Sequence, residues 1–158
     1  MPSCSETQVV EAPEGEEIDF GFVDSCMTVT CKLVDGPRVA GHFVQYGPTD
    51  LMFTTMTTKI AGRLIKAIRL VGQLKSWTPD LKEQPVIVER ATQAWSKTQR
   101  DELQNMQMDD VDAKYGEYFS QFSIAGKPDD FKAFICQKFG CPVNKMSLRP
   151  HESGNLKY

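Results

Sequence analysis

The segment DSCMTVTCKLVDGPRVAGHFV, residues 24–44, holds the residue types of this chain that are best suited to catalysis. It contains Cys26, Cys31 and His42, so two of the five cysteines and one of the two histidines lie within it. A cysteine thiolate is a strong nucleophile, and a neighbouring histidine lowers its pKa or accepts its proton. A metal site and a pair of buried strands are the alternatives for the same residue types.

Composition narrows the class of protein. A chain of 158 residues is most simply one domain, long enough to bury a core without disulfides. Its net charge of -3 gives no cationic surface for nucleic acid, and no run approaches the ~20 apolar residues of a membrane span. An odd number of cysteines and the lack of a signal peptide indicate a cytoplasmic protein. A protein exported without such a signal would have the same features.

The chain divides into two parts. Residues 1–17 contain five glutamates and no basic residue, so we expect a flexible acidic tail. Residues 18–158 are expected to form a single domain, because apolar runs and turn residues alternate throughout them.

The apolar patterns of residues 18–158 predict an α+β fold with a β-sandwich-like sheet core and two or three flanking helices. Runs rich in β-branched residues predict strands over 18–23, 26–34, 38–46, 51–56 and 85–90. Helical spacing predicts a helix over 57–77, a weaker helical region over 91–118 and a helix over 128–139 that ends at Gly140. The end of the chain, 144–158, reads as a strand, a turn and a second strand.

A metal site is not expected. Cys26 and Cys31 are five residues apart, so on one strand their side chains point to opposite faces of the sheet. Structural zinc sites have closer cysteine pairs. Buried free cysteines are common, and we interpret Cys31 and Cys136 in that way and assign no role to Cys4 in the tail.

The turn between the two strands decides whether Cys26 and His42 meet. A two-residue turn at Asp35-Gly36 would pair His42 with Val29, about 10 Å along the strand from Cys26. That distance is too long for proton transfer. A Cys–His pair therefore requires a longer loop, a bulge, or a bend of the chain at Cys26.

The same segment resembles the signature of the CheD family of receptor glutamine deamidases, in which a Gly-Ser-Cys strand is followed by Asn-His-Phe. The matching positions here are Ser25, Cys26, His42 and Phe43. The likeness continues through TTKIAGRLIKAIRLVGQLKSW, SIAGKPDDFKAFICQKFG and the closing MSLRPHESGNLKY, which resembles the final hairpin of that family. The catalytic domains of the cytotoxic-necrotizing-factor toxins share this Cys–His arrangement on a similar fold.

The resemblance implies a protein glutamine deamidase. Cys26 would attack the carboxamide of a glutamine exposed on a protein substrate, and His42 would transfer the protons, with no cofactor and no metal. Phe20 stands where the family has a threonine, so we expect a backbone carbonyl to orient His42. Asp24 and Ser25 are the alternatives for that role and are possible oxyanion neighbours. The competing hypothesis is a non-catalytic protein-binding module, an adaptor or an immunity-type protein, on the same fold.

Overall fold

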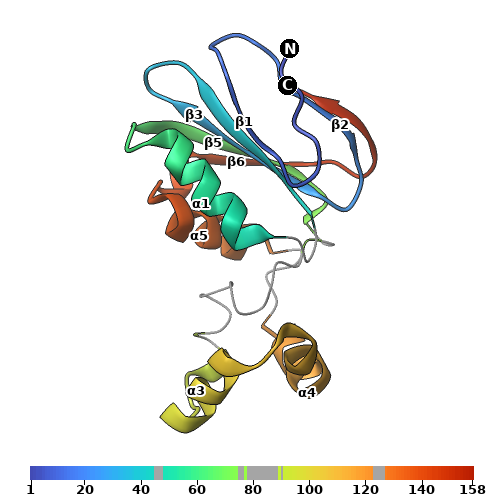
Figure 1. Ribbon diagram of the computed structural model, residues 1–158, viewed down its shortest axis with the longest axis vertical. Coiled ribbons are helices and arrows are strands. Elements are labelled where there is room, and N and C mark those ends of the chain that lie inside the picture. The colour runs from blue at the N-terminus through green and yellow to red at the C-terminus, as the bar shows by residue number, and fades with distance from the viewer. Residues whose placement is uncertain (45–47, 75–76, 78–88, 90, 123–126) are drawn as a thin grey trace.

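The computed structural model describes residues 1–158 except 45–47, 75–76, 78–88, 90 and 123–126. It confirms the α+β class, with a five-stranded sheet, a two-stranded sheet and flanking helices (Figure 1). The larger sheet has the order β1-β4-β3-β5-β6, in which β5 and β6 are parallel and the other neighbours antiparallel. Its strands are β1 (Val9–Ala12), β3 (Met27–Leu33), β4 (Arg38–Phe43), β5 (Ile65–Gly72) and β6 (Met146–Pro150).

The first face of the larger sheet carries the main apolar core. Met27, Val29, Cys31 and Leu33 alternate along β3 and are all fully buried. Helices α1 (Thr49–Ile60) and α5 (Pro128–Phe139) cover this face (Figure 1). Aromatic rings join the layers, since Phe53 of α1 contacts rings on β4 and on α5.

The second face is covered in part by the smaller sheet, which pairs β2 (Asp19–Val23) with β7 (Gly154–Lys157). Phe20 and Leu156 of this pair pack with Ala40 and Val71 of the larger sheet in a second apolar cluster. The two sheets therefore form the sandwich that the sequence predicts. Cys26 belongs to this second cluster, while Cys31 belongs to the first, so the two thiols lie on opposite faces as expected.

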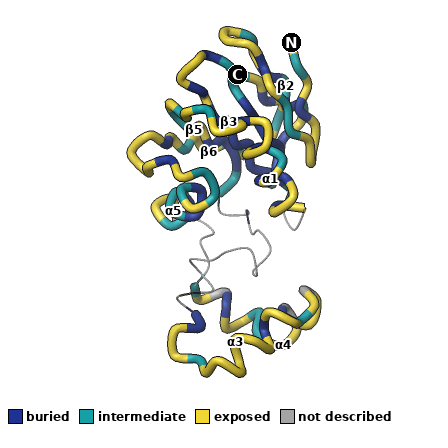
Figure 2. The backbone as a smooth tube through the Cα atoms, turned by 60° about the vertical axis from the view of Figure 1, so that its left-hand side comes forward, coloured by how far each residue is buried: buried dark blue, intermediate teal, exposed yellow. Residues whose placement is uncertain are grey.

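The helices that follow the sheet begin and end at residues with clear signals. Helix α5 begins at Pro128 and ends before Gly140, whose φ of 66° is the left-handed conformation that glycine adopts readily. Helix α3 (Lys97–Asn105) begins with a capping box between Ser96 and Gln99. Helices α3 and α4 (Met108–Ser120) lie away from the sheet, and much of their surface is exposed (Figures 1 and 2).

Two predictions for the middle of the chain are wrong. Residues 51–56 lie in helix α1 and not in a strand. In the predicted helix 57–77, residues 57–60 are the end of α1 and residues 65–72 form strand β5. The chain turns at Ala61 and Gly62, both with positive φ, which ends α1. Leu64, an apolar residue of the predicted helix, is 74% exposed, so the apolar residues of 57–77 do not form one buried helical face.

The prediction of a flexible tail is also wrong. Val9–Ala12 form edge strand β1, which pairs with Ala40 and neighbouring residues of β4. Cys4 and Ala12 are fully buried, and Ser3 forms a bridge with Asp19. One face of an edge strand can be exposed to solvent, so the exposed Glu11 does not prevent pairing.

The end of the chain has the predicted strands but not the hairpin. Strand β6 follows the short 3-10 helix η3 (Val143–Lys145) and pairs with β5, whereas β7 pairs with β2 in the other sheet. The strand predicted over 85–90 lies almost wholly outside the described residues.

Candidate functional site

The turn between β3 and β4 sets the register that brings Cys26 and His42 together. Lys32 pairs with Arg38, so residues 33–37 form a longer loop than the two-residue turn considered above. In consequence His42 pairs with Thr28. Cys26 lies two residues before Thr28, on the same side of the sheet, because side chains repeat every second residue along a strand. A change of one residue in register would have placed His42 on the other face.

The N-terminal segment completes the site from a distant part of the sequence. The backbone N–H of Cys4 donates to Asp19, and Thr7 and Gln8 exchange two backbone hydrogen bonds with His42. These bonds bring the carbonyl oxygen of Cys4 to 3.0 Å from Nδ1 of His42. The same segment places a Glu6 carboxylate oxygen 3.7 Å from the Cys26 sulfur, which donates to it.

The hydrogen bond to Cys4 fixes the tautomer of His42. A carbonyl oxygen only accepts, so Nδ1 must carry the hydrogen, and in the neutral ring Nε2 is left with a free lone pair. Nε2 is buried and has no hydrogen-bond partner among the described residues. A ring nitrogen of His42, the Cys26 sulfur and a Glu6 carboxylate oxygen all lie within 4.8 Å of one another. The histidine is thus set up as a base beside a thiol.

Burial keeps both groups neutral at rest. Desolvation, followed by the negative charge and hydrogen bond of Glu6, raises the pKa of Cys26 to about 11. Desolvation lowers the pKa of His42, and the opposing effects of the Cys4 carbonyl and Glu6 are smaller. The resting site is therefore a thiol with an imidazole. It differs from a thiolate–imidazolium pair.

A glycine allows the neighbouring strand to approach the backbone of Cys26 closely. A Cβ at Gly72 of β5 would lie 2.5 Å from the carbonyl oxygen of Cys26 and 3.0 Å from the Cα of Met27. Both contacts are with backbone, which has little room to move. Gly72 therefore helps to fix the position of Cys26 at the start of β3.

The remaining sequence predictions for this region have mixed outcomes. Asp24 is exposed and Ser25 is half-buried in the turn before β3, and the group that contacts Nδ1 of His42 is a backbone carbonyl, as expected. The ring of Phe20 lies edge-on to the His42 ring at 6.2 Å. Cys136 is half-buried, so the prediction that it is a buried cysteine is wrong.

Cys4 and Glu6 are the site residues that the sequence analysis missed. A backbone carbonyl can belong to any residue type, so nothing in the sequence marks Cys4 for its role. Glu6 is one of five glutamates in residues 1–17, and only its position beside Cys26 distinguishes it from the other four.

Glu6, Cys26 and His42 also offer the donor atoms that zinc prefers, namely a carboxylate oxygen, a sulfur and an imidazole nitrogen. The Cys4 carbonyl would fix the orientation of the His42 ring, as hydrogen-bonded carbonyl and carboxylate oxygens do for histidines that bind zinc. The three side chains therefore have the chemistry to bind a divalent ion. The expectation of a metal-free site remains a prediction.

Comparisons of the chain with protein-family models, with curated proteins and with solved structures find no match. The resemblance to the CheD family therefore remains a hypothesis based on the residues quoted above. In the part of the chain that the structure describes, no helix has the length and apolar character needed to cross a membrane.

Proposed function

We propose that this protein is a cysteine amidohydrolase that converts a glutamine side chain of a protein substrate to glutamate. The observation that carries the proposal is the arrangement of three groups from separate segments. The Cys26 thiol lies beside the ring of His42, and the Cys4 carbonyl holds Nδ1 of that ring. A nucleophile, a base and a group that orients the base are the parts of a hydrolytic triad.

The first half of the reaction forms a thioester. Nε2 of His42 accepts the proton of the Cys26 thiol, and the sulfur attacks the carboxamide carbon of glutamine. The C–N bond breaks as the imidazolium returns its proton to the leaving nitrogen, which departs as ammonia. Backbone N–H groups at the Asp24–Cys26 turn are the expected stabilisers of the oxyanion.

The second half regenerates the thiol. Nε2 of His42 accepts a proton from water, the hydroxyl adds to the thioester carbon, and the C–S bond breaks. The imidazolium then protonates the leaving Cys26 sulfur, and glutamate is released. The Cys4 carbonyl favours the imidazolium of both halves, because its hydrogen bond raises the pKa of His42. An amine in place of water would give transglutamination.

Access to the thiol limits the kind of substrate. Only 6% of Cys26 is exposed, and the exposed Glu6 side chain lies against its sulfur. A glutamine must displace Glu6 to reach the sulfur, which requires binding energy from the rest of the substrate. A folded protein with an exposed glutamine supplies that energy, and free glutamine does not. All five cysteines are free thiols, which suits a reducing compartment such as the cytoplasm.

The test is to incubate the purified protein with a cell lysate in water enriched in ¹⁸O. The expected result is one or a few glutamine sites that become glutamate and carry ¹⁸O, with release of ammonia. Cys26→Ser should abolish the labelling, because a hydroxyl is far less nucleophilic than an activated thiol. Cys31→Ser is the matched control and should retain it, since Cys31 faces the opposite side of β3. Labelling that persists in Cys26→Ser would contradict the proposal.

The non-catalytic binding module remains the second candidate. The burial of Cys26 and its raised pKa favour it, because a structural thiol is inert at neutral pH. The two hypotheses differ in the effect of His42→Ala on alkylation of Cys26. A catalytic base should make alkylation slower when it is removed, while a structural histidine should leave the rate unchanged or increase it by exposing the thiol.

A further inference from the structure

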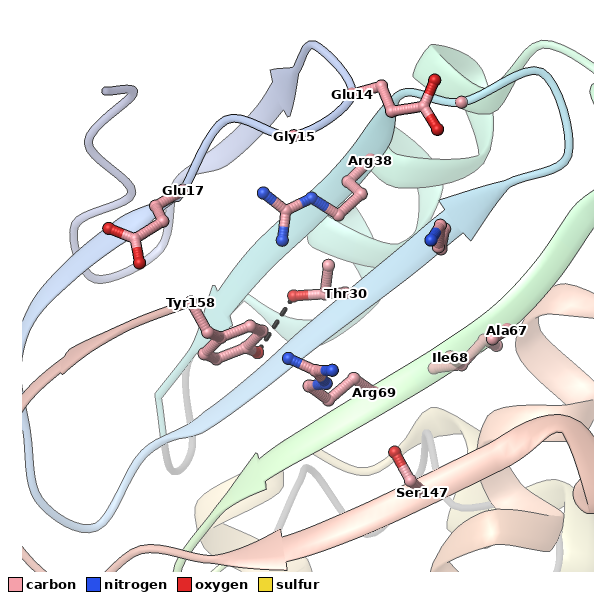
Figure 3. A pocket seen from close by; sticks show the side chains of 12 residues that line it. Glu14, Gly15, Glu17, Thr30, Arg38, Ala67, Ile68, Arg69, Ser147 and Tyr158 are labelled. Carbon is pink, nitrogen blue, oxygen red and sulfur yellow. Dashed lines mark hydrogen bonds between the residues drawn. The ribbon is translucent and has the colours of Figure 1, made fainter.

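A hollow of about 340 Å³ lies on the second face of the larger sheet, beside the part that β2 and β7 cover (Figure 3). Its floor is formed by side chains from neighbouring strands, with Thr30 from β3, Arg69 from β5 and Ser147 from β6. The register aligns them, because Thr30 pairs with Arg69 and Arg69 pairs with Ser147. The volume is within the range of pockets that bind small molecules.

Three cations from three adjacent strands line this hollow, namely Lys32, Arg38 and Arg69. Lys32 of β3 lies opposite Arg38 in the register with β4, and Arg69 of β5 lies on the other side of β3 and on the same face of the sheet. None of the three forms an ion pair with a carboxylate within the described ranges of the chain. Arg38 donates to the backbone carbonyl of Glu16, which leaves its charge uncompensated. Three unpaired cations around one hollow favour an anion.

Tyr158 contacts two residues of the floor, Thr30 and Arg69. Its hydroxyl forms hydrogen bonds with Thr28 and Thr30, at 2.8 and 3.0 Å. The guanidinium groups of Arg69 and Arg149 lie 5.1 and 5.7 Å from the centre of its ring, as cation–π contacts. Figure 3 shows Arg38, Thr30 and Arg69 projecting from three strands on the side where Tyr158 lies. Tyr158 thus contacts Thr30 and Arg69 before a ligand arrives.

The edge of the hollow has the opposite charge. Glu14 and Glu17, from the segment between β1 and β2, line it above the cations. The phosphates of a long polyanion such as nucleic acid would extend over this edge and be repelled by the two carboxylates. A compact anion can sit on the floor beside Arg69, Thr30 and Ser147 without extending along the edge. Charge distribution therefore selects a small ligand.

We propose that this hollow binds the phosphate group of a small phosphate monoester. A dianionic phosphate presents several acceptor oxygens in different directions, and the donors come from different strands: Lys32, Arg38, Arg69 and Ser147. A carboxylate has two oxygens in one plane and would leave part of this donor set unused. The site is separate from Cys26 and His42, so it does not depend on the chemistry proposed for them.

The test is isothermal titration of the full chain with inorganic phosphate and with glycerol 2-phosphate, at constant ionic strength. We expect both to bind at one site, and the monoester to bind more tightly because its glycerol group fills more of the hollow. Arg69→Gln and Lys32→Gln should each weaken binding about tenfold, as expected for loss of a charge-assisted hydrogen bond. Lys97→Gln on α3 removes the same charge far from the hollow and should leave the affinity unchanged.

Several results would overturn the proposal. Equal weakening by Lys97→Gln would show that net charge alone is measured. Unchanged affinity in Arg69→Gln, with a native circular dichroism spectrum, would place the anion elsewhere. Acetate that binds as tightly as phosphate would show a carboxylate site, and an oligonucleotide that competes better than the monoester would show a nucleic-acid surface.

Discussion

Glu6→Gln tests the electrostatics of the site directly. The Glu6 carboxylate lies 3.7 Å from the Cys26 sulfur, and its charge helps to raise the pKa of that thiol to about 11. With that pKa, only about one thiol in a thousand is ionised at pH 8. Two charges ~4 Å apart interact by about 1 kcal/mol in water, the appropriate limit because Glu6 is exposed. Removing the charge should therefore increase the thiolate fraction about fivefold.

The assay is the rate of alkylation by iodoacetamide at pH 8, followed at each cysteine by peptide mass. Half-buried Cys136 would react early, so the measurement uses a Cys136→Ser background. In that background Cys26 should react before Cys31, which is fully buried, and Glu6→Gln should accelerate Cys26 about fivefold. Because only the thiolate reacts, the rate should rise with pH up to about 11.

Glu17→Gln is the matched control, since it removes the same charge from the N-terminal region without contacting Cys26 and should not change the rate. A rate in Glu6→Gln that is equal to that of the control, or lower, would refute the electrostatic reasoning. It would mean that access, and not ionisation, limits the reaction of Cys26.

Three further predictions concern stability. Gly72→Ala should lower the free energy of unfolding by about 1–3 kcal/mol and the melting temperature by several degrees, because the new methyl group meets the backbone of Cys26. The control Gly116→Ala in α4 adds a methyl group that meets nothing within 4 Å and should stabilise the protein. Equal effects of the two substitutions would contradict the close approach at Gly72. Burial lowers the pKa of His42, so protons bind the unfolded state more readily and stability should fall as the pH drops below about 6.5. Denaturant melts should show a shallower fall for His42→Gln, and identical slopes would mean that His42 does not contribute. Deleting residues 2–12 should lower the melting temperature by many degrees, since it removes β1; a small change would show that this strand contributes little.

The sequence predicted those parts of the fold in which one local pattern dominates. Strand β3 and helix α5 have strong signals, with alternation in the first and Pro128 and Gly140 at the ends of the second. The prediction for residues 51–77 was wrong because the same sequence fits both the spacing of a helix and the alternation of a strand. The prediction of a helix took no account of Gly62, whose positive φ ends α1. Residues 65–72 form strand β5 because β3 and β6 pair with them. Tertiary pairing of this kind is not visible in a local window.

The site was predictable only in part for a similar reason. Cys26 and His42 were identified by residue type, but their contact depends on a register that differs by one residue from the two-residue turn. The sequence suggested a backbone carbonyl as the group that orients His42, although it did not indicate which residue supplies it. That residue, Cys4, reaches the site through long-range backbone hydrogen bonds.

The position of β1 at the edge of the larger sheet has a consequence for how long the site stays assembled. Edge strands open locally more often than central ones, because only one neighbour holds them. Cys4 is also held by its backbone hydrogen bond to Asp19. The ring of His42 therefore loses its acceptor only when the N-terminal segment leaves both β4 and Asp19, while the β3–β4 hairpin keeps Cys26 beside His42. Amide hydrogen exchange should therefore show Thr7 and Val10 exchanging much faster than Val29. For the proposed hydrolase, the time for which His42 stays oriented is then set by how long the N-terminal segment stays in place.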